Sequence, residues 1–277
     1  MNNYNLINDD SLKWMKNAKD NSIDAIITDP PYGLTYLDRE FDTMENTPAA
    51  GGNRKGLKGG GMRWEANQNK DLSKFLTPFF EEGYRILKPG SFCIVFSQGR
   101  LLLGVLSALE KAGFEIREQF YWRKPTALPN QQSPNRKNSK IKIDTDRVIL
   151  GPSKVVEPFV IAQKPREGTY ANNWSKWETG LVDPKEAMST VWECPSASKK
   201  EKAGLTHVTV KPLSLMKRIV RVFSKENDIV LDPFSGSGTT GAACMLEQRN
   251  YIGIEISKKF YDESLLRLKS IEKSFKS

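Results

Sequence analysis

Short apolar runs alternate with longer segments of helical periodicity over most of the 277-residue chain. Apolar runs of four to eight residues are typical of buried strands, whereas apolar positions three and four residues apart are typical of helices. The runs predict strands at residues 23–28, 91–97, 114–122, 155–162, 190–193, from 229 onward and 251–256. The periodic segments predict helices at residues 11–18, 72–87, 100–112, 212–223 and 257–277. This alternation favours an α/β fold with a mainly parallel, twisted sheet and helices on both faces.

The tetrapeptide Asp29-Pro30-Pro31-Tyr32 follows directly on the apolar run of residues 23–28. Each proline fixes its own φ angle, and the residue before a proline is kept out of the helical region, so this turn is extended and stiff. It holds the Asp29 carboxylate and the next carbonyl groups beside the aromatic ring of Tyr32. Such acceptors and such a plane suit a flat ring that bears an amino group. On the tetrapeptide alone, a proline-rich strand end without further function stays open as the alternative.

A glycine-rich turn follows the run that starts at Ile229, and it leads into a predicted helix. Its glycines are Gly236, Gly238 and Gly241, and Glu255 lies near the end of the strand that comes after the helix. Glycines let a backbone approach a ligand closely, and a carboxylate accepts hydrogen bonds from ribose hydroxyls. The pattern therefore predicts an adenosine site. The alternative is a tight turn between a strand and a helix, and the preceding Asp232-Pro233-Phe234 is not typical of a dinucleotide site.

Together the two motifs resemble the S-adenosylmethionine-dependent amino-methyltransferases of DNA. Because the tetrapeptide precedes the glycine turn, the chain resembles the beta group of that family. Three further segments are similar to family motifs: residues 8–12, residues 87–91, which resemble the turn before the next strand, and residues 206–212. Val208 stands where the family often has proline after the histidine, which leaves the role of His207 open. The resemblance implies a Rossmann-like methyltransferase fold.

The resemblance also implies roles for individual residues. Asp29 and the Pro30 carbonyl would accept hydrogen bonds from the target amino group, and Tyr32 would stack on the target base, with Pro31 completing the catalytic motif. The cofactor would be S-adenosylmethionine. The residues expected to bind it are Asp10, Lys211, Asp232, Phe234, Ser235, Gly236, Ser237, Gly238 and Glu255. No metal site is expected.

The leading Asp29 favours adenine N6 as the acceptor, because in the family an aspartate more often accompanies adenine and a serine cytosine. Cytosine N4 stays open, since its amino chemistry is nearly the same. Cytosine C5 is disfavoured, because that reaction needs a nucleophilic cysteine in a Pro-Cys context, whereas Cys194 precedes Pro195. Methylation of RNA or of a protein amide, and an inactive DNA-binding regulator, are the remaining alternatives.

The positive charge is concentrated in one part of the chain. The formal net charge is +9, and residues 120–170 contain ten Lys or Arg against four Asp or Glu. Basic side chains contact phosphates, and the Asn and Gln of residues 129–136 are able to read base edges. We therefore expect an inserted DNA target-recognition region at residues 124–191, between a catalytic half (residues 1–123) and a cofactor-binding half (residues 192–277). A solvated loop is the alternative.

Other features bear on where the protein acts and with what. Residues 49–61 are rich in glycine and predict a flexible loop, either over DNA or as a tolerated insertion. Cys93, Cys194 and Cys244 lack disulfide-scaffold and metal-site spacing. No stretch approaches the roughly 20 apolar residues of a membrane span, so we expect a cytoplasmic protein that does not contact membranes. DNA is the expected partner, and a homodimer and a cognate restriction endonuclease are open ones.

Overall fold

The computed structural model describes residues 4–32, 67–126, 135, 143–148, 152–186, 189–206 and 210–275. The glycine-rich segment 49–61 and His207 lie outside these residues, as does most of the segment 129–136. The strands are β1 Tyr4–Ile7, β2 Ile23–Thr28, β3 Leu87–Phe96, β4 Glu115–Arg123, β5 Val156–Gln163, β6 Val191–Glu193, β7 Ile229–Asp232 and β8 Asn250–Ile254. The helices are α1 Ser11–Asn17, α2 Gln68–Ile86, α3 Leu102–Lys111, α4 Tyr170–Trp177, α5 Leu213–Phe223, α6 Thr239–Leu246 and α7 Lys258–Ser274, with a 3₁₀ turn, η2, at Gly99–Leu101.

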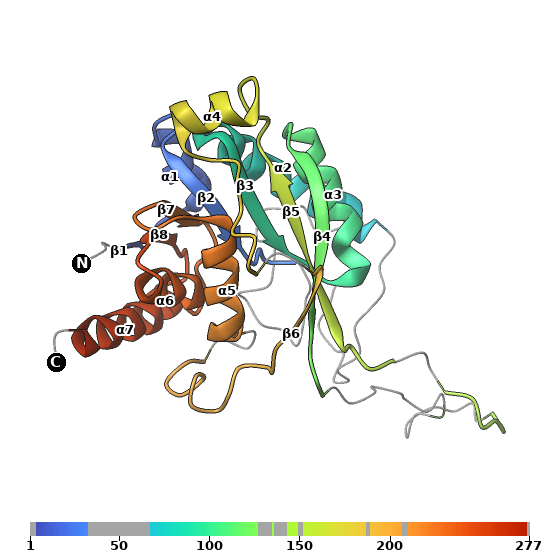
Figure 1. Ribbon diagram of the computed structural model, residues 1–277. Coiled ribbons are helices and arrows are strands. Elements are labelled where there is room, and N and C mark those ends of the chain that lie inside the picture. The colour runs from blue at the N-terminus through green and yellow to red at the C-terminus, as the bar shows by residue number, and fades with distance from the viewer. Residues whose placement is uncertain are drawn as a thin grey trace.

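The eight strands of the described residues form one twisted sheet in the order β1-β8-β7-β2-β3-β5-β4-β6 (Figure 1). Every neighbouring pair is parallel except the two pairs that involve β5, which runs antiparallel to β3 and β4. The predicted mainly parallel sheet is therefore confirmed. Strand β5 and the first residue of β6 belong to the segment 124–191, so part of that segment completes the sheet.

Helices cover both faces of the sheet, as the alternation of the sequence predicts. One apolar core lies between the sheet and α5, α6 and α7, with Ile219, Ala243 and Leu268 fully buried (Figure 1). The other lies between the sheet and α1, α2 and α3, where Met15 and Leu76 are buried. Residues 257–277 were expected to form a packing helix, and α7 is one.

One local expectation differs from the structure, and two elements were not predicted. Residues 87–91 were expected to form a turn before β3, but they belong to β3 itself. The register with β2 jumps from Leu87 to Phe92, so these residues form a bulge, with Gly90 at φ 81°. The sequence pattern did not indicate β1 or α4. Strand β1 is a four-residue edge strand with only Leu6 buried, which is too short for a periodic signal.

None of the described helices is long and apolar enough to span a membrane. The described cysteines Cys93, Cys194 and Cys244 are all buried and form no disulfide. Burial raises the pKa of the Cys93 and Cys244 thiols well above the usual value. Both side chains therefore act as small apolar groups in the core.

Candidate active site

The predicted site residues meet at one edge of the sheet. Strands β1, β8, β7 and β2 are neighbours and run parallel, so their carboxyl ends lie side by side. Asp10 follows β1, Glu255 follows β8, the glycine turn follows β7, and Asp29 follows β2. In open parallel sheets, ligand sites form at this edge because the connecting loops converge there. The fold thus assembles, from four separate segments, the two motifs that the sequence indicates.

Asp29 is held by two neighbours. Its Oδ1 accepts a hydrogen bond from the Tyr32 hydroxyl at 2.5 Å, and its Oδ2 lies 2.5 Å from the Lys211 ammonium. The Asp29 side chain is 23% exposed, so it still reaches the surface at the end of the strand. Within the tetrapeptide, Pro30 is buried and Pro31 is half-buried. The tetrapeptide therefore presents one fixed carboxylate, as its rigid sequence predicts.

The glycine turn is fixed by the strands on either side of it. Gly236 and Gly238 have φ angles of 50° and 69°, which favour glycine. The Ser235 N–H donates to the Ile254 carbonyl at 2.9 Å, and its hydroxyl lies 2.9 Å from the Tyr251 hydroxyl. Ser237, between the two glycines, is buried. These contacts hold the turn open towards the end of β8.

Glu255 lies directly beside this turn. Its Oε2 accepts from the Gly236 N–H at 2.8 Å, and its Oε1 accepts from the Ser257 N–H at 2.8 Å. Burial raises the pKa of Glu255, although both N–H groups favour the carboxylate. A carboxylate oxygen accepts more than one hydrogen bond, so each Glu255 oxygen has acceptor capacity for a ribose hydroxyl.

Asp232 connects the two motifs. It is almost fully buried, and its carboxylate accepts from the Thr28 hydroxyl at 2.8 Å and from the Thr240 hydroxyl at 2.7 Å. Thr28 is the last residue before Asp29, so this bond sets the tetrapeptide against the glycine turn. The pKa of Asp232 is raised to about 6. Burial is the main cause and the Asp29 charge adds to it, whereas the two hydroxyls act in the opposite direction. The contacts of Asp232 with these protein groups make it an organiser of the site, and its expected contact with the cofactor stays a prediction.

The remaining residues of the cofactor prediction lie at different distances from the turn. Phe234 is half-buried within the turn, and its ring centroid is 5.0 Å from that of Phe79 in α2. Asp10 is exposed and caps α1 by accepting from the Lys13 N–H at 2.8 Å. Ser11, next to Asp10, donates to the Pro233 carbonyl, which brings this segment to the glycine turn.

Lys211, which was expected to bind the cofactor, lies beside the tetrapeptide. Its ammonium, 2.5 Å from Asp29 Oδ2, is also 2.8 Å from Glu157 Oε1 and lies over the Phe96 ring. Sequence reasoning did not single out Glu157. The available signal was an acid at the start of the apolar run of residues 155–162, where an unpaired charge is costly.

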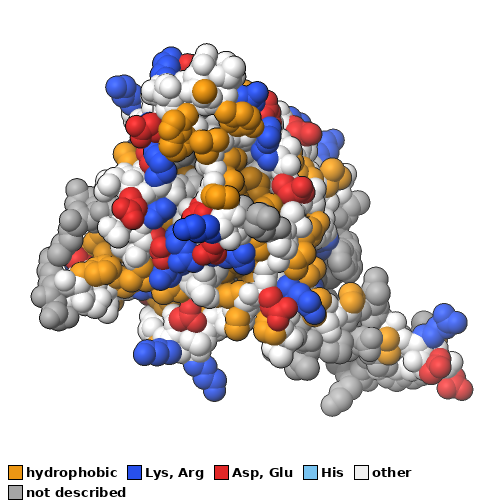
Figure 2. All heavy atoms as spheres, in the orientation of Figure 1, with side chains coloured by type: hydrophobic (Ala, Val, Ile, Leu, Met, Phe, Trp, Pro, Cys, Tyr) orange, Lys and Arg blue, Asp and Glu red, His pale blue; other side chains and the backbone are white. Residues whose placement is uncertain are grey.

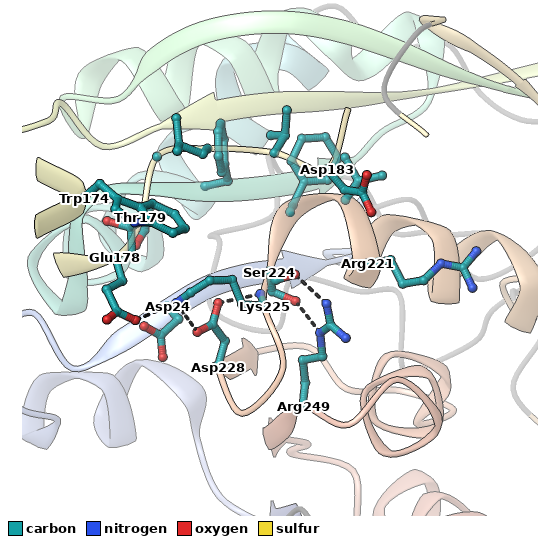
Figure 3. A pocket seen from close by; sticks show the side chains of 17 residues that line it. Asp24, Trp174, Glu178, Thr179, Asp183, Arg221, Ser224, Lys225, Asp228 and Arg249 are labelled. Carbon is teal, nitrogen blue, oxygen red and sulfur yellow. Dashed lines mark hydrogen bonds and ion pairs between the residues drawn. The ribbon is translucent and has the colours of Figure 1, made fainter. Parts of the chain in front are cut away.

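A cavity of about 290 Å³ lies elsewhere, near the amino ends of β2 and β7 (Figure 3). Its charged groups already bind one another: the Lys225 ammonium lies 3.0 Å from Asp228 and 3.4 Å from Glu178. The Arg249 guanidinium donates to Ser224. No predicted site residue lines this cavity, and its internal pairing indicates a structural role.

Charge pairing also distinguishes the surfaces of the molecule. In Figure 2, basic and acidic side chains lie next to each other over the region of α5. Arg218 and Arg221 on that helix pair with Glu186 at 2.9 and 2.8 Å, and Lys217 pairs with Glu247 at 3.0 Å. Helix α5 therefore offers few uncompensated cations. Residues 143–148, which lie between β4 and β5 in the sequence, are instead placed away from the sheet (Figure 1).

Comparison with known proteins gives a consistent result. The family profile described as DNA methylase, N6_N4_Mtase, matches residues 23–266. The type II methyltransferase M.HindIII of Haemophilus influenzae is 30% identical over 97% of this chain and 96% of its own length. The type II methyltransferase M2.MboI of Moraxella bovis is 28% identical over 97% of this chain and 89% of its own length.

Solved structures share the fold. The cytosine-N4-specific PvuII DNA methyltransferase has a TM-score of 0.64 at 19% identity, covering 99% of this chain and 92% of its own. The M1.HpyAVI–SAM complex has a TM-score of 0.58 at 23% identity, covering 96% and 99%. With the family profile spanning the tetrapeptide, the glycine turn and most of α7, the chain belongs to the N6_N4_Mtase family of DNA methylases and is a DNA methyltransferase.

Proposed function

We propose that the protein transfers the methyl group of S-adenosylmethionine to the exocyclic N6 of adenine in DNA. The observation that carries this proposal is the bond from Thr28 to Asp232, which sets the Asp29 carboxylate beside the glycine turn. An acceptor for an amino group thus lies next to a turn suited to an adenosine. Asp29 at the first position of the tetrapeptide favours adenine. Cytosine N4 is the second candidate, because the PvuII enzyme with the same fold is cytosine-N4-specific.

The residues at the glycine turn fit S-adenosylmethionine. Gly236 leaves backbone accessible at a strand end, Glu255 provides acceptors for ribose hydroxyls, and Phe234 provides an aromatic face. Bound there, the cofactor supplies an electrophilic methyl group on a sulfonium centre. The proposed cofactor residues are Asp10, Asp232, Phe234, Ser235, Gly236, Ser237, Gly238 and Glu255. Lys211, which was also expected at the cofactor, is assigned in this proposal to the support of Asp29.

Asp29 makes the target nitrogen reactive in this proposal. The lone pair of an exocyclic amino group is delocalised into the base, so the nitrogen is a poor nucleophile. Acceptance of its hydrogens by Asp29 and by the Pro30 carbonyl localises the lone pair and aims it at the methyl group. The Tyr32 ring stacks on the base. Orientation and fixed acceptors supply most of the rate, without a covalent intermediate.

The buried thiols support direct transfer. Addition to a cytosine ring needs a thiolate, but burial raises the pKa of Cys93 and Cys244 and keeps them protonated. Cys194 is buried as well, and its sulfur lies 3.0 Å from the Ser214 hydroxyl. Among the described residues, then, the Asp29 carboxylate, which accepts hydrogen bonds, fits methylation of an amino group better than methylation of a ring carbon.

DNA approaches the carboxyl edge of the sheet in this proposal. A base inside a duplex reaches Asp29 only after it is rotated out, at an unstacking cost of a few kcal/mol. The segment that joins β4 to β5 leaves the sheet at the same edge, and we propose residues 124–155 as the part of segment 124–191 that recognises the target. A second copy of the chain and a cognate restriction endonuclease are further proposed partners.

The proposal is tested by incubating the purified protein with unmethylated DNA and S-adenosylmethionine, followed by digestion to nucleosides and mass spectrometry. N6-methyladenine is the expected product. N4-methylcytosine would keep the chemistry of Asp29 and change the base. The absence of any methylated nucleoside, with cofactor binding intact, would contradict the proposal and direct the search to RNA or protein substrates.

Replacement of Glu255 tests the cofactor site. We expect Glu255→Ala to weaken binding of S-adenosylmethionine about 10- to 100-fold, because it removes a charged acceptor of ribose and of the Gly236 N–H. Isothermal titration calorimetry measures the change. Glu226→Ala, which removes an exposed acid, is the matched control and should bind like the wild type. Equal affinities for all three proteins would place the ribose elsewhere.

A further inference from the structure

Four side chains of alternating charge form a continuous chain at the catalytic edge. Asp29 contacts Lys211 at 2.5 Å, Lys211 contacts Glu157 at 2.8 Å, and Glu157 contacts Lys124 at 2.9 Å. The side chains of Lys211 and Glu157 are only 9% and 18% exposed. Buried charges persist where they are paired on all sides. These four side chains therefore link the catalytic carboxylate to the start of β5, two strands away from β2 in the sheet.

We infer that Glu157 is a positioning residue for methyl transfer, which holds the Lys211 ammonium, and through it the Asp29 carboxylate, in the place that the reaction requires. The inference rests on the proposed function, since it gives Asp29 its catalytic role. Glu157 does not touch the reacting atoms in this assignment. It acts through Lys211 alone.

The geometry explains why Asp29 needs this support. Lysine has a long and flexible side chain, so a single ion pair does not fix its ammonium. Here the ammonium is bound between two carboxylates and lies 4.8 Å from the centre of the Phe96 ring. Without Glu157, Lys211 would be free to follow Asp29 or to swing away from it. With Glu157, Lys211 is held at Asp29 Oδ2 while Oδ1 accepts from the Tyr32 hydroxyl, so the carboxylate is fixed from both sides. Each oxygen keeps acceptor capacity for a substrate.

The titration behaviour of the pair agrees with this reading. Burial alone would lower the pKa of Lys211, but Asp29 and Glu157 raise it well above its usual value. Burial alone would raise the pKa of Glu157, but Lys211 and Lys124 lower it. Both groups thus stay charged at neutral pH, and the ion pairs persist. Lys124 also joins the end of β4 to the start of β5, because its N–H donates to the Val155 carbonyl at 2.7 Å.

Substitution of Glu157 is the direct test. Glu157→Gln has nearly the same size but lacks the charge, and we expect kcat for DNA methylation to fall about 10- to 100-fold, because small misplacements of catalytic groups have effects of this size. The KM for S-adenosylmethionine and the Kd for DNA should stay within about twofold. Glu157→Asp, with the charge retained on a shorter side chain, should give an intermediate kcat. Glu193→Gln removes the partner of Arg123 in a pair whose side chains are about 60% exposed, and this control should match the wild type.

A double-mutant cycle separates positioning from a general structural effect. If Glu157 acts through Lys211, then Glu157→Gln should lower kcat little further in a Lys211→Met background. Losses that multiply independently would overturn the inference, as would an unchanged kcat of Glu157→Gln. Thermal unfolding checks that each variant is folded. If Glu157→Gln does not fold, Glu157→Asp takes its place in the cycle. A wild-type protein that leaves DNA unmethylated would overturn the proposed function itself, whereas an active wild type matched by Glu157→Gln overturns this inference alone.

Discussion

Asp29→Ala is expected to lower kcat for DNA methylation by about three orders of magnitude, a loss typical of removing a preorganised polar group from an active site. The substitution removes the carboxylate that, in the proposed function, accepts from the target amino group. Affinity for S-adenosylmethionine should change less than about twofold, because the glycine turn and Glu255 are held by contacts with β8 and α7 and not by Asp29.

Single-turnover methylation with radiolabelled cofactor measures the rate, and calorimetry measures the affinity. Asp262→Ala is the matched control, because Asp262 is an exposed acid in α7 that pairs only with Lys258 among the ion pairs of the described residues. Retention of more than a tenth of the wild-type rate by Asp29→Ala would refute the role of Asp29. A parallel loss of cofactor affinity would instead indicate a damaged site.

Asp232→Asn should change the pH dependence of stability. Burial raises the pKa of Asp232 in the folded protein from 3.8 to about 6. The folded state therefore binds this proton more tightly than the unfolded state, and the free energy of unfolding decreases as the pH rises through this range. The shift corresponds to about 3 kcal/mol in total, of which about 2 kcal/mol is lost between pH 4.5 and pH 8.

The asparagine variant lacks this titration and keeps an oxygen for the Thr28 hydroxyl and an amide for Thr240. Its free energy of unfolding relative to the wild type should thus rise by about 2 kcal/mol between pH 4.5 and pH 8. Urea unfolding at both pH values, followed by circular dichroism, measures the difference. A difference that is constant with pH would show that Asp232 has no raised pKa in the folded protein.

The local structure of both motifs follows from the sequence. The apolar run of residues 23–28 is the strand β2, and the two prolines after it allow only an extended turn. The run that starts at Ile229 is β7, and Gly236 and Gly238 after it adopt the positive φ angles that other residues avoid. These features are encoded within about ten residues. Side-chain periodicity and backbone restriction act locally, so they can be read without a partner.

Tertiary structure alone decides how the segments meet. The sequence does not give the strand order, and only that order sets β7 beside β2 and allows Thr28 to bind Asp232. It also places Lys211 at Asp29 and recruits Glu157, which no motif indicates. The edge strand β1 was likewise not predicted, because a short edge strand has little apolar pattern and is defined by its pairing with β8. Charges and edges depend on neighbours distant in sequence, whereas turns and buried strands depend on their own residues.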